Sequence, residues 1–461
     1  MKQCKVFVPF GALGTGISED AFQRGLALGP DIISTDAGST DSGPYYLGTG
    51  TGKYARAAVM RDMEQLMLAA HALHIPITVG SAGTCGSDRG VDDLADICRQ
   101  IAQKHGITAK IARIYTQQEP TVLKEKYRQG RVHALEGAPP ITEHTFDACS
   151  NIVGLAGAEP FMEALSQGVD IVLCGRATDT AVIAAYPLLC GCDPAASWHA
   201  AKTAECGCLC TTNPQGGGVF LTVDEQGFTV QATAADSSCT PYSVSAHLLY
   251  ENADPVRLVE PGVLVDTSAS VYTQLDEGAV RVEGTVSQPM PYTMKLEGSA
   301  PAGYQTISLV GVRDRDVLRD PLRWLDALGR YVQGKLAQMG IAPGQYQYDL
   351  KPYGYNAVYR GLVPEGYIPN EIGVLLTVTA STQALATQVA KAFNPYLLHF
   401  PVHRDQQLPS FAFPMSPAET ERGPIYAFQL YHVVQMDHPL EGCRIHYTQI
   451  GTEGADHGET V

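Results

Sequence analysis

The chain has 461 residues, of which 45% are apolar and 17% charged, so its composition predicts a compact globular protein of two or three domains and excludes a disordered chain. Forty-eight acidic and 32 basic residues give a net charge of −16 at pH 7. This balance argues against nucleic acid as a partner, because binding to phosphates depends on basic side chains. No apolar run reaches about 18 residues, so we expect no membrane segment.

The amino-terminal segment predicts a strand rather than a targeting peptide. Residues 1–14 enter an apolar run directly, without the basic stretch and cleavage site of a signal peptide, and we therefore expect a cytoplasmic protein. A glycine-rich turn containing Gly14 and Gly16 follows, and a helix is expected over 18–28. The turn would let an anionic substrate approach the backbone closely, and it is equally suited to a tight turn alone.

Two further predicted strands, 31–35 and 75–79, end in polar loops. The candidate site residues in these loops are two carboxylates and five hydroxyls: Asp36, Asp41, Ser39, Thr40, Ser42, Ser81 and Thr84. Small polar side chains directly after strands are typical of a small-molecule pocket, and a long solvated loop has the same composition.

A fourth predicted strand, 109–115, leads to Glu119. This carboxylate is a candidate general base, and its alternative role is a hydrogen bond to a backbone amide. If the predicted strands are parallel, the loops after residues 10, 35, 80, 115 and 175 leave the sheet at one edge, where α/β proteins bind ligands.

The stretch 151–187 has the clearest pattern in the chain. Apolar runs at 152–155 and 170–174 bracket a helical segment, which predicts a β-α-β unit with two buried parallel strands. Arg176 and Asp179 follow the second run, at the start of a further helix. They are candidate site residues, and the alternative is that they pair with each other or cap that helix.

The segment from Gly157 to Ala181, GAEPFMEALSQGVDIVLCGRATDTA, resembles the acyclic terpene utilisation (AtuA) family. The resemblance continues through 254–266 and 371–400, so it covers most of the chain. It implies a role in bacterial catabolism of carboxylic acids or their coenzyme A thioesters, and the family name alone does not specify the reaction.

The second half of the chain changes character after a glycine-rich break near residue 213. A hairpin is predicted at 219–230, with helices at 323–339 and 383–393 and a strand at 373–378. We expect an α/β protein with three parts: an amino-terminal parallel-sheet domain over 1–212, a mixed α+β domain over 213–400, and a carboxyl-terminal extension over 401–461 packed on the second domain.

The chain contains two clusters of potential metal ligands, the cysteines at 190–210 and the histidines at 399–457. The C-x-C spacing is tight for a structural zinc site, and a proline at 401 interrupts the only suitable histidine pair, so no metal is expected. The chain also has no Walker motif, dinucleotide fingerprint or nucleophile elbow, so no cofactor is expected.

These patterns favour cofactor-free acid–base chemistry on a small carboxylate or an acyl-CoA. In this hypothesis the protein is a hydratase, lyase or isomerase in which Arg176 holds the carboxylate and Asp36 or Asp41 moves a proton. The alternative is a non-catalytic, acyl-CoA-binding accessory component of a terpene or branched-chain acid pathway. A homo-oligomer is a further expectation.

Overall fold

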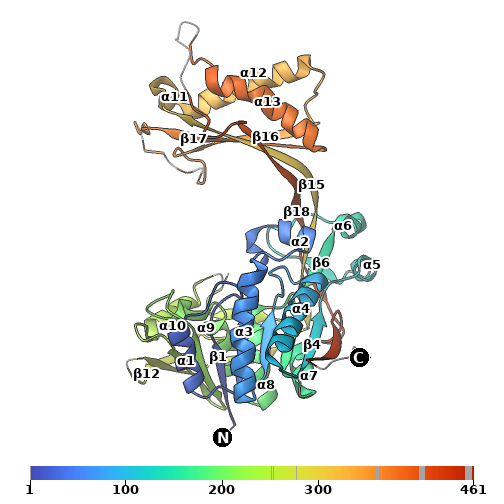
Figure 1. Cartoon of the computed structure of the whole chain (residues 1–461), viewed down its shortest axis with the longest axis vertical. Helices are drawn as coiled ribbons and strands as arrows, with labels where there is room; N and C mark the ends of the chain where they lie inside the picture. The colour runs from blue at the N-terminus through green and yellow to red at the C-terminus, as the bar shows by residue number, and fades with distance from the viewer. Residues whose placement is uncertain are drawn as a thin grey trace. The chain divides into compact units, whose positions relative to one another are not determined.

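The computed structural model describes residues 2–250, 252, 254–276, 278–359, 361, 363–364, 366–403 and 411–451, together with the backbone of 459–460 (Figure 1). The strands are β1 (Gln3–Val8), β2 (Ile32–Asp36), β3 (Ile77–Gly80), β4 (Ala109–Tyr115), β5 (Val132–Ala134), β6 (Asn151–Gly154), β7 (Ile171–Cys174), β8 (Val219–Asp224), β9 (Gly227–Ala232), β10 (Arg257–Glu260), β11 (Val263–Asp266), β12 (Val271–Gln274), β13 (Ala279–Glu283), β14 (Val286–Pro289), β15 (Thr293–Val312), β16 (Tyr346–Tyr353), β17 (Ile372–Ala380), β18 (Glu419–Gln435), β19 (Arg444–Ile450) and β20 (Glu459–Thr460).

The helices are α1 (Glu19–Ala27), α2 (Tyr45–Thr49), α3 (Arg56–Leu73), α4 (Asp88–His105), α5 (Pro120–Arg128), α6 (Glu143–Ala148), α7 (Glu159–Ser166), α8 (Asp179–Cys190), α9 (Pro194–Ala204), α10 (Pro241–His247), α11 (Arg315–Arg319), α12 (Pro321–Gln338) and α13 (Gln383–His399). In the described part of the chain, none of them has both the length and the apolar character needed to cross a bilayer. The chain forms two compact units: the first is Met1–Ala300 with Phe428–Val461, and the second is Pro301–Ala427.

A large mixed sheet forms the centre of the first unit. Its five middle strands, in the order β1-β2-β3-β7-β4, are parallel, and the antiparallel strands β8 and β19 extend it on the two sides. The loops after the five parallel strands therefore leave the sheet at one edge, as expected for an α/β fold. The predicted fold class is confirmed.

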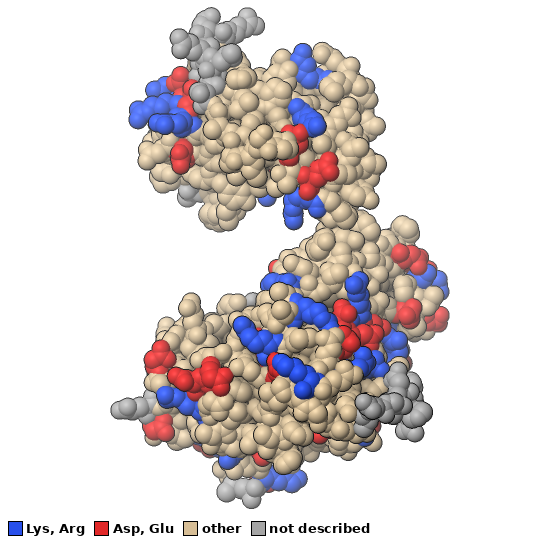
Figure 2. Space-filling model, in the orientation of Figure 1, with Lys and Arg blue, Asp and Glu red and all other residues tan. Residues whose placement is uncertain are grey.

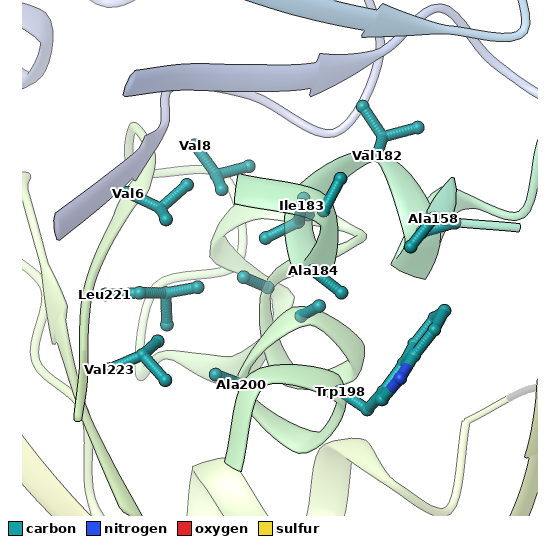
Figure 3. Packing of buried hydrophobic residues seen from close by; sticks show 14 of the residues in the cluster. Val6, Val8, Ala158, Val182, Ile183, Ala184, Trp198, Ala200, Leu221 and Val223 are labelled. Atoms are coloured by element: carbon teal, nitrogen blue, oxygen red, sulfur yellow. The ribbon is translucent and has the colours of Figure 1, made fainter. Parts of the chain in front are cut away.

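Helices cover both faces of this sheet because the side chains of its strands alternate. Phe7 of β1 packs on one face with residues of α1, α3 and α4, whereas its neighbours Val6 and Val8 pack on the other face with residues of α7, α8 and α9. Figure 3 shows Val6 and Val8, together with Leu221 of β8, pointing toward Ile183 of α8. Helix α8 is apolar almost all round, which explains why it lies buried against the sheet.

The strand at 151–154 does not pair as the sequence predicts. The β-α-β interpretation places it parallel to β7 in the same sheet, but β6 pairs antiparallel with β15, with Gly154 opposite Leu296 and Asn151 opposite Ser299. The predicted parallel pairing is wrong. A short apolar run predicts a buried strand but does not specify whether its neighbour is β7 or β15. The pairing brings β15 next to the loop that follows β7.

The hairpin β8–β9 is confirmed, and it extends the large sheet through β1. The carboxyl-terminal strand β19 joins the same sheet through β4, whereas the sequence predicts that 401–461 packs on the second domain. The boundaries between the two compact units fall after residues 300 and 427, whereas the sequence predicts domain boundaries after residues 212 and 400. The division into three domains stays a prediction.

The second unit is an antiparallel layer covered by helices. Strand β17 pairs with β16 and with the part of β15 from Tyr304 to Val312. Leu328 of α12 and Phe393 of α13 are fully buried with Val374, Leu376 and Val378 of β17. The alternation of buried and half-buried residues along β17 is typical of a sheet with one covered face.

Substituting Gly86 with alanine is expected to destabilise the first unit. Gly86 has φ of +66°, and an added Cβ would lie 2.1 Å from the backbone nitrogen of Arg176. Left-handed backbone and overpacking together should lower the free energy of unfolding by about 2–5 kcal/mol in urea titrations. Gly106→Ala is the matched control, because Gly106 has φ of +65° and no atom within 4 Å. Equal losses in the two variants would contradict the close contact with Arg176.

Candidate functional site

A cavity of about 650 Å³ opens in the first unit at the carboxyl edge of the parallel strands. Its size is that of a small-molecule site. The residues that line it come from the loops after β2, β6 and β7, from α8, from α9 and the residue that follows it, and from β10, β15 and β18. Most of them are polar or charged: Ser39, Thr40, Asp41, Leu155, Arg176, Thr178, Asp179, Thr180, Lys202, Glu205, Glu260, Lys295, Glu297, Phe428, Leu430 and Tyr431.

Arg176 is part of the wall of this cavity, and only 7% of its side chain is exposed. Its Nε donates to Glu297 Oε2 at 3.1 Å, and its Nη1 donates to Ser81 Oγ at 2.9 Å and lies 3.6 Å from Asp179 Oδ1. No described residue accepts a hydrogen bond from Nη2. One side of the guanidinium is thus fixed by the protein, and Nη2 remains as a donor for a ligand.

Glu297 is the carboxylate that fixes Arg176. It is nearly buried, and it also accepts from Thr40 Oγ1 at 3.0 Å and contacts Lys295 Nζ at 3.1 Å. Burial alone would raise the pKa of Glu297, but Arg176 and Lys295 lower it to about 2. Glu297 is therefore ionised at neutral pH and holds two cations at the wall of the cavity. The Lys295 Nζ also lies 4.7 Å from the ring centre of Tyr431.

Asp179 is the first residue of α8, and Thr178 caps this helix by accepting from the Ala181 amide at 3.1 Å. The side chain of Asp179 is about two-thirds buried, with 31% exposed, and it lines the cavity. Burial and the neighbouring Glu205 raise the pKa of Asp179 to about 7, although Arg176 opposes this shift. A carboxyl group with this pKa can both accept and release a proton near neutral pH.

Asp36 lies behind the cavity wall, at the end of β2. It is buried, its Oδ2 accepts from the Gly38 amide at 2.6 Å, and no described residue hydrogen bonds to its Oδ1. Burial raises its pKa well above the usual value, and the negative charge of Asp179 adds to this effect. The raised pKa favours the neutral form of Asp36, and this form reduces the repulsion among the carboxyl groups around Arg176.

A second charged group lies across α9 and β10. Lys202 Nζ contacts Glu205 Oε1 at 2.6 Å, and Thr180 Oγ1 donates to Glu205 Oε2 at 2.5 Å. Burial raises the pKa of Glu205 and of Glu260, and Lys202 opposes both shifts. Glu260 Oε2 is buried without a hydrogen-bond partner among the described residues. These carboxyl groups are candidates for a second proton donor.

The structure brings together only part of the residues predicted from the sequence. Arg176, Asp179, Asp41, Ser39 and Thr40 line the cavity. Ser39 Oγ donates to Asp41 Oδ2 at 2.6 Å at the exposed rim.

Ser81 and Asp36 do not line the cavity, but Ser81 accepts a hydrogen bond from Arg176 and the Asp36 carboxyl group acts electrostatically on it. Thr84 lines a different cavity. Ser42 and Glu119 are exposed and do not line the large cavity.

The predicted glycine-rich turn binds a carboxylate of its own chain. The amides of Gly14 and Gly16 donate to Asp62 Oδ2 at 3.0 and 2.9 Å, and Asp62 is fully buried. Neither glycine lines the large cavity. The described residues contain no group of three or more metal-ligating side chains arranged around one point, and the last candidate histidine, His457, lies outside the described residues.

Five charged residues of the cavity were not predicted: Lys202, Glu205, Glu260, Lys295 and Glu297. The sequence does carry a weak signal for some of them. Lys295 and Glu297 are charges two positions apart in one strand, with the apolar Met294 and Leu296 before and between them, so the two charges lie on one face. Glu260 lies within the stretch 254–266 that carries the family resemblance.

The fold and the cavity define an α/β protein with a charged cavity at the carboxyl edge of its parallel strands. The chain belongs to the acyclic terpene utilisation family: the model of "acyclic terpene utilisation family protein AtuA" matches residues 46–410. This confirms the resemblance seen in the sequence. The matched range includes Arg176, Asp179 and Glu297. No curated protein and no solved structure matches the chain.

The Asp179→Asn variant should lose part of the pH dependence of stability. Because the pKa of Asp179 is raised to about 7, the folded protein binds this proton more tightly than the unfolded chain, in which an Asp has a pKa of about 3.9. Its contribution to stability is therefore present at low pH and is lost as the pH rises through about 7. Thermal unfolding at pH values from about 4 to 8 should show a smaller decline in the variant than in the wild type.

Asp147→Asn is the control for this measurement, since Asp147 is half exposed, pairs with Lys124 and lies outside the cavity. It should retain the decline of the wild type. An equal decline in Asp179→Asn would show that Asp179 does not hold a proton in the folded protein near neutral pH.

Proposed function

We propose that this protein is a cofactor-free acid–base enzyme, a hydro-lyase or isomerase, that acts on a small carboxylic acid or its coenzyme A thioester. The observation that carries the proposal is the contrast between two carboxyl groups of the same cavity: the pKa of Glu297 is lowered to about 2, and the pKa of Asp179 is raised to about 7. Carboxyl groups whose environments separate their pKa values in this way are typical of acid–base catalysis.

The contacts suggest a role for each side chain. The free Nη2 of Arg176 and the Nζ of Lys295 hold the substrate carboxylate or thioester oxygen, and Glu297 keeps both cations in place. Asp179, 3.6 Å from Arg176, takes a proton from the carbon next to that group. The resulting negative charge develops on the oxygen held by the cations, where it is stabilised.

The second step needs a proton donor, and Glu205 and Glu260 supply it in this proposal. Burial raises the pKa of both groups, which favours their protonated forms, and both residues line the cavity. In a hydro-lyase this proton goes to the leaving hydroxyl, which departs as water. In an isomerase it goes to another carbon of the substrate. The same residues serve both reactions, so their arrangement supports acid–base catalysis in general and does not distinguish a hydro-lyase from an isomerase.

Proton exchange in deuterated water is the test. Branched aliphatic carboxylates and their coenzyme A thioesters are incubated with the protein, and deuterium incorporation next to the carbonyl is followed by NMR. The rate should rise with pH to a plateau above about 7, because Asp179 must be ionised to accept the proton. Asp179→Asn should abolish the exchange. Ligand binding without exchange in the wild type would favour an acyl-CoA-binding accessory protein instead.

Arg176→Lys should weaken substrate binding or rate by about 10- to 100-fold, because lysine keeps the charge but loses the planar fork of donors. Arg113→Lys is the control: Arg113 pairs with Asp92 at 3.0 Å, is largely buried and lies outside the cavity. Affinity and melting temperature are measured on the same samples. A lower melting temperature with unchanged substrate affinity per folded molecule would mean that Arg176 stabilises the fold and does not bind the substrate.

A further inference from the structure

A second cavity, of about 350 Å³, lies in the first unit between the amino-terminal parts of α3 and α4. Ala37 and Thr84 are part of its wall, so it adjoins the same loops that carry Ser39, Thr40 and Ser81. It shares no lining residue with the cavity that contains Arg176.

The inner wall of this second cavity is apolar. Leu13, Leu94 and Ile97 are almost completely buried, and Val59 of α3 is half-buried beside them. Apolar surface of this kind is stabilised when an apolar ligand replaces water. In contrast to the cavity around Arg176, most of the inner wall offers no hydrogen-bonding group to a ligand.

The outer rim of the second cavity is cationic. Lys53, Arg56 and Arg89 line it, and Figure 2 shows Lys and Arg atoms gathered on the face of the first unit over which α3 and α4 run. Arg56 is held by Asp96 at 2.6 Å, and Arg89 forms a longer ion pair, 3.8 Å, with Asp93, the one carboxylate among the described residues that line this cavity.

Lys53 has no carboxylate partner among the described residues, and its Nζ lies 5.2 Å from the ring centre of Tyr54. Lys53 and Arg89 can therefore bind an additional anion.

The backbone around this cavity is constrained. Thr84 has φ of +79°, an uncommon conformation for a β-branched residue, and such strain is found most often at ligand sites. Gly83 and Gly90 pack against each other, and a Cβ at Gly90 would lie 2.4 Å from the carbonyl oxygen of Ala82. The loop after β3 is thereby held tightly against the start of α4, and the shape of the cavity is preformed.

We propose that the second cavity binds an amphiphilic organic anion, namely a medium-length aliphatic chain with a carboxylate head. The chain lies against Leu13, Leu94 and Ile97, and the carboxylate meets Lys53 and Arg89. A volume of about 350 Å³ is at the small end of ligand pockets, which suits such a molecule and is too small for a whole coenzyme A. This site is independent of the proposed catalytic function.

Octanoate is the probe, and its binding is measured by isothermal titration calorimetry on the full chain. Butyrate should bind on the order of 100-fold more weakly, because each buried methylene contributes a factor of about four. 1-Octanol should bind about tenfold more weakly, because it lacks the charge that Lys53 and Arg89 recognise. Equal affinity for octanoate and 1-octanol would overturn the anionic part of the proposal.

Two variants test the location. Gly52→Phe should fill the cavity, because Gly52 lines it and a Cβ there would meet only Gly83 at 3.8 Å, so octanoate binding should fall at least tenfold. The double variant Lys53→Gln and Arg89→Gln should weaken octanoate about tenfold and leave 1-octanol unchanged. Arg99→Gln is the matched control, an exposed cation of α4 outside the cavity.

Melting temperatures establish that each variant is folded, and the double variant carries the test if Gly52→Phe does not fold. Octanoate affinity within twofold of the wild type in the double variant would overturn the proposal. Weaker octanoate binding in Arg176→Lys, with no effect of the double variant, would place the ligand in the other cavity and would equally overturn it. None of these outcomes changes the expected exchange by Asp179.

Discussion

The buried ion pair between Arg176 and Glu297 is the interaction on which the large cavity depends. It joins the loop after β7 to β15. Arg176 also donates a hydrogen bond to Ser81 after β3, and Glu297 accepts one from Thr40 after β2. Four segments that are distant in sequence therefore meet at one guanidinium–carboxylate contact. Removing one partner of a buried pair typically costs about 3–5 kcal/mol, because the remaining charge has no water around it.

The same pair creates the electrostatic contrast between the carboxyl groups. Glu297 receives most of the stabilisation from Arg176 and Lys295, so its pKa falls despite its burial. Asp179 is farther from the guanidinium and close to Glu205, so burial dominates and its pKa rises. A chain with a net charge of −16 thus places a protonatable carboxyl beside cations that an anionic substrate can use. Charge arrangement, rather than a cofactor, is the basis of the proposed chemistry.

The two cavities share loops, although they share no lining residue. Ala37 borders the smaller cavity and Thr40 the larger one. The loop after β3 contributes Thr84 to the wall of the smaller cavity, and its Ser81 accepts a hydrogen bond from Arg176 in the wall of the larger one. Both Ser81 and Thr84 have positive φ, at 48° and 79°. Strained backbone persists only where the surrounding packing fixes it. The close contact of Gly86 with the backbone of Arg176 supplies part of that packing, which links the geometry of the two cavities.

The sequence by itself determined the α/β class, the family and the importance of the segment around Arg176 and Asp179, because apolar runs, helix signals and a long spaced motif are local properties. It also predicted that loops after parallel strands share one edge. Only the tertiary structure decided that β6 pairs with β15 and that Glu297, Lys295, Lys202 and Glu260 line the same cavity as Arg176. Strand pairing and the partner of a buried charge depend on residues that are distant in the sequence, 121 positions apart for Arg176 and Glu297, and no local pattern encodes which distant partner neutralises a charge.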